Sequence, residues 1–122
     1  MFTISKQFHF SASHQLLGLT EDHPCSRLHG HNYVVEVELQ AQELNQHGFV
    51  RDYHDLKELK TWIDETFDHR HLNDHFGDTP STAENLALAI YNWCIERWPE
   101  TTATRVSETP KTWAEYKPST AS

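Results

Sequence analysis

The chain has 122 residues, of which 37% are hydrophobic and 11% aromatic, and this size and composition predict one folded domain over residues 1–122. The formal net charge of −8 argues against nucleic acid as a partner, because phosphate backbones are bound by basic surfaces. No apolar run approaches the ~20 residues of a membrane helix, and the N-terminus lacks the apolar stretch of a signal peptide. We therefore expect a cytoplasmic protein with no membrane partner.

Two segments in the first third of the chain have the alternation of β-strands. In residues 3–14 the positions on one face are Ile4, Phe8, Phe10, Ala12 and His14. In residues 31–41 they are His31, Tyr33, Val35, Val37 and Leu39, opposite Glu36, Glu38 and Gln40. One apolar and one polar face are typical of half-buried antiparallel strands.

Two later segments have the period of amphipathic helices. The first covers residues 54–67, with Asp52 as the predicted N-cap. The second covers residues 81–98, where Ser81 and Glu84 fit a capping box and Cys94 lies in the apolar stripe. We expect Cys94 to pack between this helix and the sheet.

Two short strand-like stretches, residues 103–109 and 112–116, close the chain, and residues 68–80 are expected to form a loop between the helices. The order β-β-α-α-β-β predicts an α+β fold in which two helices cover one face of an antiparallel sheet. The other face would then be solvated or covered by another subunit.

Three histidines are candidate metal ligands. His29 and His31 are two residues apart at a strand start, so both side chains lie on one face, and His14 ends the first strand on its apolar face. If these strands pair as a hairpin, three imidazoles converge where desolvation without a partner is costly. Three protein ligands with an open position are typical of catalytic zinc. The alternative is an ordinary pair of histidines at a strand end.

Cys25 lies four residues before His29, outside any periodic segment. Two roles compete for it: fourth ligand of the metal, or nucleophile or base beside the metal. The histidine at position 23 has no predicted role.

Two further groups are candidates for acid–base chemistry or binding. Asp68 and His69 are adjacent, and an aspartate can fix the tautomer of a histidine that acts as a general acid. Glu108 is two residues after Val106 and so is expected on the same face of the strand. There its carboxylate could bind the amidine-like edge of a pterin or guanine through two hydrogen bonds. An exposed strand-edge glutamate is the alternative. We expect His71 and His75 to be exposed loop residues.

The sequence motifs resemble those of the 6-pyruvoyl-tetrahydropterin synthase family. "FHFSASH", "CSRLHGHNY", "FVRDYHDLK", "FDHRHLN", "TAENLA" and "VSET" follow one another in the family's order over residues 2–117. The short spacing from Cys25 to His29 is most similar to the bacterial branch, the 6-carboxy-5,6,7,8-tetrahydropterin synthases.

The resemblance implies a tunnelling fold (T-fold), a four-stranded antiparallel sheet with two helices on one face. It implies Zn²⁺ held by His14, His29 and His31. Cys25 would be the catalytic proton acceptor, and Asp68 and His69 a proton-relay pair. Glu108 would anchor the pterin and belong to the same relay. Homo-oligomers, trimers or hexamers with active sites at subunit boundaries, are also implied.

The implied activity is that of a lyase in queuosine (7-deazaguanine) biosynthesis. It would convert 7,8-dihydroneopterin triphosphate to 6-carboxy-5,6,7,8-tetrahydropterin, acetaldehyde and triphosphate. Two alternatives stay open: elimination of triphosphate without side-chain cleavage, which gives 6-pyruvoyl-tetrahydropterin, and a non-catalytic module that binds zinc or a pterin.

Overall fold

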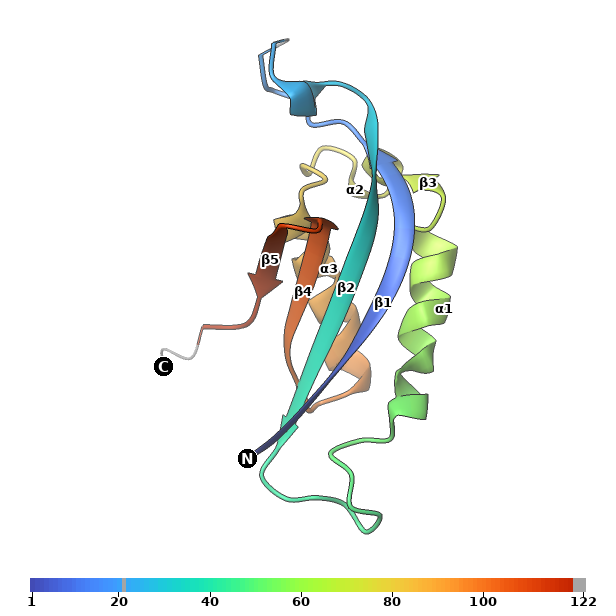
Figure 1. The fold of residues 1–122 in the computed structure, drawn as a ribbon, viewed down its shortest axis with the longest axis vertical. Coiled ribbons are helices and arrows are strands. Elements are labelled where there is room, and N and C mark those ends of the chain that lie inside the picture. Colours follow the sequence, from blue (N-terminus) through green and yellow to red (C-terminus); the bar gives the residue numbers. More distant parts are fainter. Residues whose placement is uncertain (21, 120–122) are drawn as a thin grey trace.

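The computed structural model describes residues 1–20 and 22–119. Its strands and helices are shown in Figure 1. The strands are β1 (Phe2–His14), β2 (His29–Ala41), β3 (Arg70–His71), β4 (Thr101–Thr109) and β5 (Thr112–Tyr116). The α-helices are α1 (Lys57–Thr66), α2 (Leu72–Phe76) and α3 (Ala83–Arg97), and two 3-10 turns are η1 (Pro24–Ser26) and η2 (Tyr53–Leu56).

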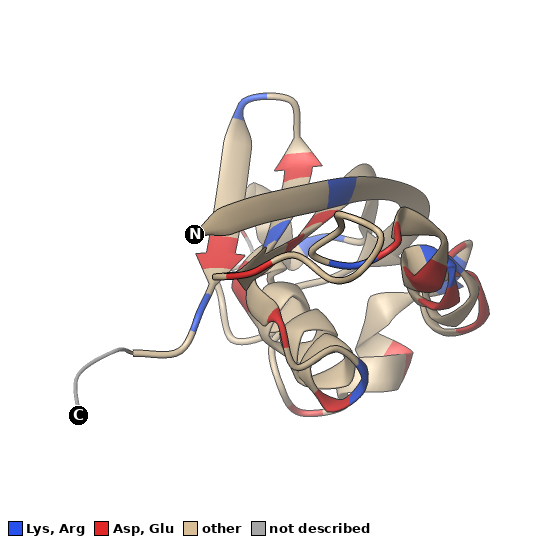
Figure 2. Cartoon of the chain, turned by 90° about the horizontal axis from the view of Figure 1, so that it is seen from below, with Lys and Arg blue, Asp and Glu red and all other residues tan. Residues whose placement is uncertain are grey.

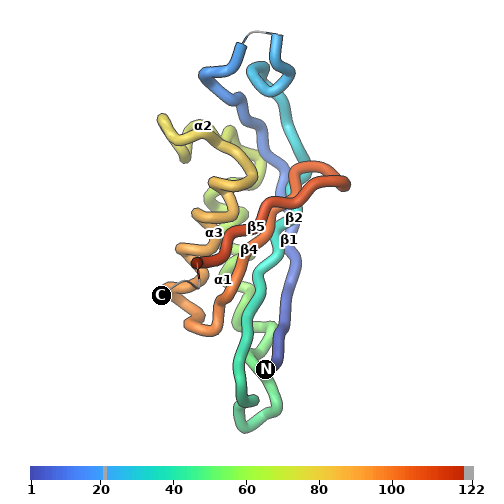
Figure 3. The backbone as a smooth tube through the Cα atoms, turned by 90° about the vertical axis from the view of Figure 1, so that its left-hand side faces the viewer, coloured from blue at the N-terminus to red at the C-terminus, as the bar shows by residue number. Residues whose placement is uncertain are grey.

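A long antiparallel hairpin of β1 and β2 forms the centre of the sheet. Its register runs from Phe2 opposite Ala41 to His14 opposite His29, and the strand order is β3-β1-β2-β4-β5. The helices lie on one side of the sheet, and no layer formed by the described residues covers the other side (Figure 3). The predicted α+β arrangement is therefore confirmed.

The sheet is more complex than the predicted four antiparallel strands. Residues 68–80, expected to be a loop, contain β3, which pairs in parallel with Ala12 and Ser13 of β1, and the short helix α2. A two-residue strand and a five-residue helix are too short to produce a recognisable hydrophobic period. The short strand makes the sheet mixed and adds a fifth strand that the sequence pattern did not predict.

The predicted helix caps are partly wrong. Asp52 caps as expected, but it accepts a hydrogen bond from the backbone N–H of His54 and so caps η2, which precedes α1. The N-cap of α3 is Thr82, whose hydroxyl accepts from the Asn85 N–H at 3.2 Å. Ser81 is fully buried and lies outside the helix, because its main chain contacts a histidine of β1.

The core lies between the helices and the apolar face of the sheet. The alternation in β1 and β2 is as predicted, and Cys94 is fully buried within the core. The opposite face is polar: Arg105 forms ion pairs with Glu36 and Glu38 at 2.9 and 3.0 Å. Acidic and basic positions are interspersed along strands and helices in the view of Figure 2. None of the helices in the described part of the chain is long and apolar enough to cross a membrane.

Candidate metal centre and acid–base pair

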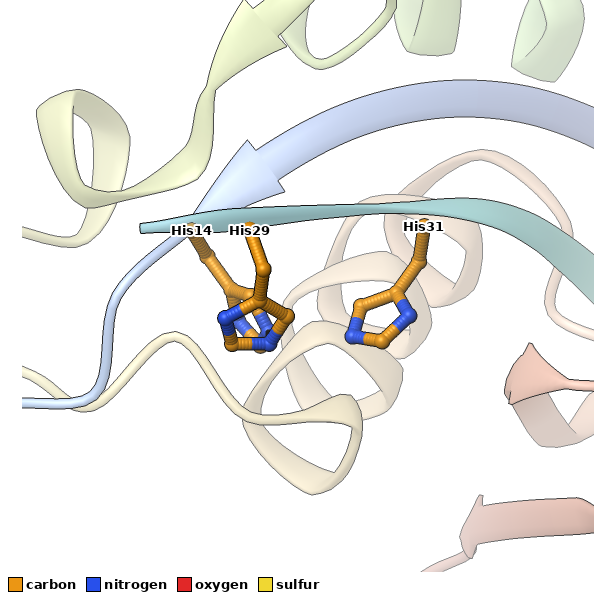
Figure 4. A group of neighbouring side chains, drawn as sticks. All are labelled: His14, His29 and His31. Carbon is orange, nitrogen blue, oxygen red and sulfur yellow. Dashed lines mark hydrogen bonds between the residues drawn. The ribbon is translucent and has the colours of Figure 1, made fainter. Parts of the chain in front are cut away.

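Three histidine side chains converge at one end of the β1–β2 hairpin. His14 comes from the end of β1, and His29 and His31 come from the start of β2; all three project to the same side of the strands (Figure 4). One nitrogen of each ring lies within 4.8 Å of the others. The side-chain positions therefore agree with the face predicted from strand parity.

Backbone carbonyls fix the tautomers of two of these histidines. Nδ1 of His14 lies 2.8 Å from the Ser81 carbonyl oxygen, and Nδ1 of His29 lies 2.6 Å from that of Arg27. A carbonyl oxygen only accepts, so both Nδ1 atoms carry the proton and each neutral ring has its lone pair on Nε2. These two Nε2 atoms face each other at 2.9 Å.

Two facing lone pairs repel unless a proton or a metal ion is held between them. A tetrahedral ion with Zn–N bonds of about 2.0–2.1 Å separates its ligand nitrogens by about 3.3–3.4 Å, so a small adjustment brings the His14 and His29 nitrogens to this spacing. Burial lowers the pKa of both His14 and His31, which favours the neutral form that binds metals. The donor set therefore fits a divalent metal ion.

Glu108 lies beside this cluster, on the same face of the sheet. Its Oε2 atom is 3.7 Å from Nε2 of His31, and a third of its side chain is exposed. The neighbouring Tyr33 is completely buried, and its hydroxyl has no hydrogen-bond partner among the described residues. Burial and the charge of Glu108 raise the pKa of Tyr33. A carboxylate and an unpaired hydroxyl thus accompany the three imidazoles.

Cys25 lies on the turn η1, and its sulfur is not among the converging ligand atoms. The turn is capped by His23, whose Nδ1 accepts from the Cys25 N–H at 3.1 Å. It is also joined to the end of β1, because the Gln15 side chain donates to the Ser26 carbonyl at 2.7 Å. His23, which had no predicted role, therefore shapes the turn that carries the thiol.

Asp68 and His69 form a pair at the edge of β1. One carboxylate oxygen of Asp68 accepts from the Ser11 N–H at 2.9 Å, and the other lies 2.9 Å from Nδ1 of His69. The Ser11 hydrogen bond, followed by that of His69, lowers the pKa of Asp68. His69 has a left-handed backbone with φ of 57°, an unusual conformation for a non-glycine residue, and 82% of its side chain is exposed.

One open cavity joins the Asp68–His69 pair to the histidine cluster. His69 and His71 line this cavity of about 470 Å³ together with His31 of the cluster and with Ser11, Ser13 and Asn32. Cys25 does not line this cavity. His71 is also not the exposed loop residue that we expected: it is half-buried in β3, and its Nδ1 lies 3.0 Å from the Ser13 hydroxyl.

Three residues near the histidines were not identified by sequence reasoning: Asn73, Ser81 and Tyr33. Asn73 and Tyr33 lie within the quoted motifs "FDHRHLN" and "CSRLHGHNY", where they could have been noticed but had no evident chemistry. Ser81 was interpreted as a helix cap, and its contact with His14 depends on tertiary structure.

Comparisons with known proteins agree on one family. The family model described as 6-pyruvoyl tetrahydropterin synthase matches residues 3–119. The 6-carboxy-5,6,7,8-tetrahydropterin synthase of Bacillus subtilis is 31% identical over 129 aligned positions, covering 96% of this chain and 86% of that protein. The enzyme of the same name from Rickettsia felis is 37% identical, covering 75% and 79%. The structure of Caenorhabditis elegans 6-pyruvoyl tetrahydropterin synthase has a TM-score of 0.85 at 30% identity, covering 97% of this chain and 96% of that one.

Proposed function

Because the chain belongs to the 6-pyruvoyl tetrahydropterin synthase family, we propose that it is a zinc-dependent 6-carboxy-5,6,7,8-tetrahydropterin synthase of queuosine biosynthesis. Its substrate would be 7,8-dihydroneopterin triphosphate, and its products 6-carboxy-5,6,7,8-tetrahydropterin, acetaldehyde and triphosphate. The observation that carries the proposal is the pair of facing Nε2 atoms of His14 and His29. Several relatives that align over most of the chain bear the name of this enzyme, which supports the choice of product.

His14, His29 and His31 would hold the Zn²⁺ ion. Bound there, Zn²⁺ supplies a Lewis acid that polarises oxygen atoms of a substrate. The carbonyls of Ser81 and Arg27 keep the Nε2 atoms of two ligands unprotonated, so these rings need no proton loss before they bind the ion.

The remaining side chains divide binding and proton transfer between them. Glu108 would accept hydrogen bonds from the amidine-like edge of the pterin. Cys25, as a thiolate, would remove a proton from a side-chain carbon. His69 would return a proton at another position, and Asp68, which is held by the Ser11 N–H, would orient its ring and support its charged form. Glu108 would take part in the same relay.

The proposed reaction balances without an external oxidant or reductant. Loss of triphosphate and internal proton shifts oxidise the two side-chain carbons nearest the ring to carbonyls. The same shifts reduce the third carbon, which loses the triphosphate, to a methyl group and the dihydropterin ring to the tetrahydro form. Water then cleaves the bond between these two carbons: one becomes the carboxylate on the ring, and the other leaves in acetaldehyde.

We propose that the working enzyme is a homo-oligomer, a trimer or hexamer with active sites at subunit boundaries. The uncovered polar face of the sheet supports this (Figure 3). A second support is that His69 lines a cavity that does not include Cys25. The cysteine and the acid–base pair of one active site would then come from different subunits.

One product analysis tests the activity. Zinc-loaded protein is incubated with 7,8-dihydroneopterin triphosphate, and the pterin product is identified by mass. We expect 6-carboxytetrahydropterin with acetaldehyde. A pyruvoyl product without acetaldehyde would favour the alternative synthase, and unchanged substrate would favour a non-catalytic module that binds zinc or a pterin.

A cysteine pair provides a matched test of the role of Cys25. Cys25→Ala should retain zinc and lose turnover. Cys94→Ala, at a fully buried cysteine in the core, should lower stability and retain turnover. If Cys25→Ala loses its zinc, Cys25 is a ligand and its proposed role as a base is wrong.

A further inference from the structure

We propose that Asn73 is a positioning residue of the metal centre, because it ties the backbone beside His14 to the loop that orients the His14 ring. The inference rests on the proposed function in one respect, that the three histidines bind a metal. It concerns a residue that touches neither the metal nor the substrate and acts through its neighbours.

The first contact of Asn73 is with the main chain of Gln15, which follows His14. Oδ1 of Asn73 accepts from the Gln15 N–H at 2.9 Å, and Nδ2 of Asn73 donates to the Gln15 carbonyl at 2.7 Å. The side-chain amide therefore pairs with Gln15 as a neighbouring strand would. It continues the pairing of β1 beyond Ala12 and Ser13, where β3 ends.

The second contact of Asn73 is with Ser81, whose main chain contacts the His14 ring. The Ser81 hydroxyl donates to Oδ1 of Asn73 at 3.3 Å, and the Ser81 carbonyl accepts from Nδ1 of His14 at 2.8 Å. The loop is further held by Asn85, whose side chain donates to the Pro80 carbonyl at 2.8 Å. Asn73 thus connects the backbone that carries His14 to the carbonyl that fixes its tautomer.

The side-chain amide of asparagine or glutamine places an acceptor and a donor side by side, as the Gln15 peptide requires. Loss of either bond lets the end of β1 move relative to the Ser81 loop. The His14 ring then no longer points Nε2 reliably at the position shared with His29 and His31. Outer-shell changes of this kind typically cost about 10- to 100-fold in metal affinity.

The experiment measures Zn²⁺ affinity by competition with a chromophoric chelator and records the visible spectrum of the Co²⁺ form. We expect Asn73→Ala to bind Zn²⁺ about 10- to 100-fold more weakly than the wild type, with altered Co²⁺ bands. Asn45→Ala is the matched control. Oδ1 of Asn45 accepts two backbone hydrogen bonds, from His47 at 2.9 Å and Phe49 at 3.0 Å. Because this turn lies at the other end of the hairpin, the metal affinity of the Asn45→Ala variant should not change.

Asn73→Asp separates positioning from charge and preserves the size of the side chain. The carboxylate still accepts from the Gln15 N–H, but its second oxygen faces the Gln15 carbonyl, so half of the pairing is lost. An added negative charge alone would strengthen cation binding, whereas loss of positioning weakens it. We expect weaker Zn²⁺ binding. Wild-type or tighter binding by this variant would overturn the inference.

A further variant distinguishes the main chain of Ser81 from its side chain. Ser81→Ala retains the carbonyl that orients His14 but removes the hydroxyl that joins the loop to Asn73, so it should weaken Zn²⁺ binding less than Asn73→Ala, which also loses both bonds to Gln15. Wild-type affinity in Ser81→Ala would contradict the proposed connection to the Ser81 loop, and a loss as large as that of Asn73→Ala would contradict the contribution of the Gln15 bonds. If the wild-type protein itself does not bind Zn²⁺, the proposed metal centre is wrong. If the wild type and the Asn73 variants bind Zn²⁺ with equal affinity, only the proposed role of Asn73 is wrong.

Discussion

The histidine cluster and the Asp68–His69 pair both contact the strand β1, but their surroundings differ. His14 is 2% exposed and its ring is hydrogen-bonded to a carbonyl of the loop before α3. The His69 side chain is 82% exposed, and it is held by Asp68 at the strand edge. His14 is therefore enclosed by its own chain, whereas His69 is presented to the surroundings.

This difference indicates what each group needs in order to work. The three imidazoles are already oriented and only need a cation, so the metal centre is preorganised within one chain. The Asp68–His69 pair has a fixed orientation, and its exposed His69 ring lines an open cavity that His31 also lines. The comparison therefore predicts that changes at the cluster alter metal binding, whereas changes at the pair alter turnover alone.

The largest expected effect is that of His29→Ala. This removes one of three ligands, and because the ring of His29 is partly exposed, the fold should survive. We expect Zn²⁺ affinity to fall by more than ~1,000-fold, beyond the ~10–100-fold of an outer-shell change. His75→Ala, at an exposed histidine outside the cluster, is the control. Competition titrations measure both, and wild-type affinity in His29→Ala would rule out the proposed ligand set.

The second prediction concerns the other half of the comparison. Asp68→Asn removes the carboxylate that orients His69 and should lower turnover about 100- to 1,000-fold, within the range of general acid–base catalysis. Zn²⁺ affinity should stay at the wild-type value. Steady-state kinetics and chelator competition measure the two effects, and a variant with normal turnover would contradict the relay.

The third prediction is a pH dependence of stability in the metal-free protein. Burial lowers the pKa of His14 and His31, so below their usual pKa of 6.5 the unfolded chain binds more protons than the folded one. The free energy of unfolding should therefore fall as the pH drops below about 6.5. Urea unfolding in a chelator tests this, and His31→Gln should reduce the pH slope. An unchanged slope in that variant would contradict the contribution of His31.

The smallest expected effect is that of Tyr33→Phe. The buried hydroxyl of Tyr33 has no partner among the described residues, and an unpaired buried polar group is costly. Its removal should leave the free energy of unfolding of the metal-free protein unchanged or raise it by up to about 1 kcal/mol. Chemical denaturation measures this. A clear loss of stability would mean that the hydroxyl has a partner.

The hydrophobic periodicity of the sequence correctly predicted those strands and helices that bury one of their faces. The parity of β1 and β2 correctly brought His14, His29 and His31 to one side, because a pleated strand leaves a side chain only two directions. The same reasoning put Glu108 on the inward face of its own strand, with Val106. The separate placement of Cys25 agrees with its position outside any periodic segment.

The parts that failed depend on contacts between distant segments. Ser81 matches the sequence pattern of a cap as well as Thr82 does, and the two are distinguished only by the hydrogen bond from His14 to the Ser81 carbonyl. Asn73 pairs with a residue 58 positions earlier in the chain, and no local sequence pattern predicts such a contact. The strand β3 is defined by its partner in β1 and has no period of its own.

The central claim is that three histidines, without Cys25, hold a metal ion at the end of the β1–β2 hairpin. X-ray absorption spectroscopy of the zinc-loaded protein tests it most directly. We predict nitrogen or oxygen neighbours at about 2.0–2.1 Å and no sulfur neighbour at about 2.3 Å, with one ion per chain that is lost in His29→Ala. A sulfur neighbour, or full metal occupancy in His29→Ala, would contradict the account.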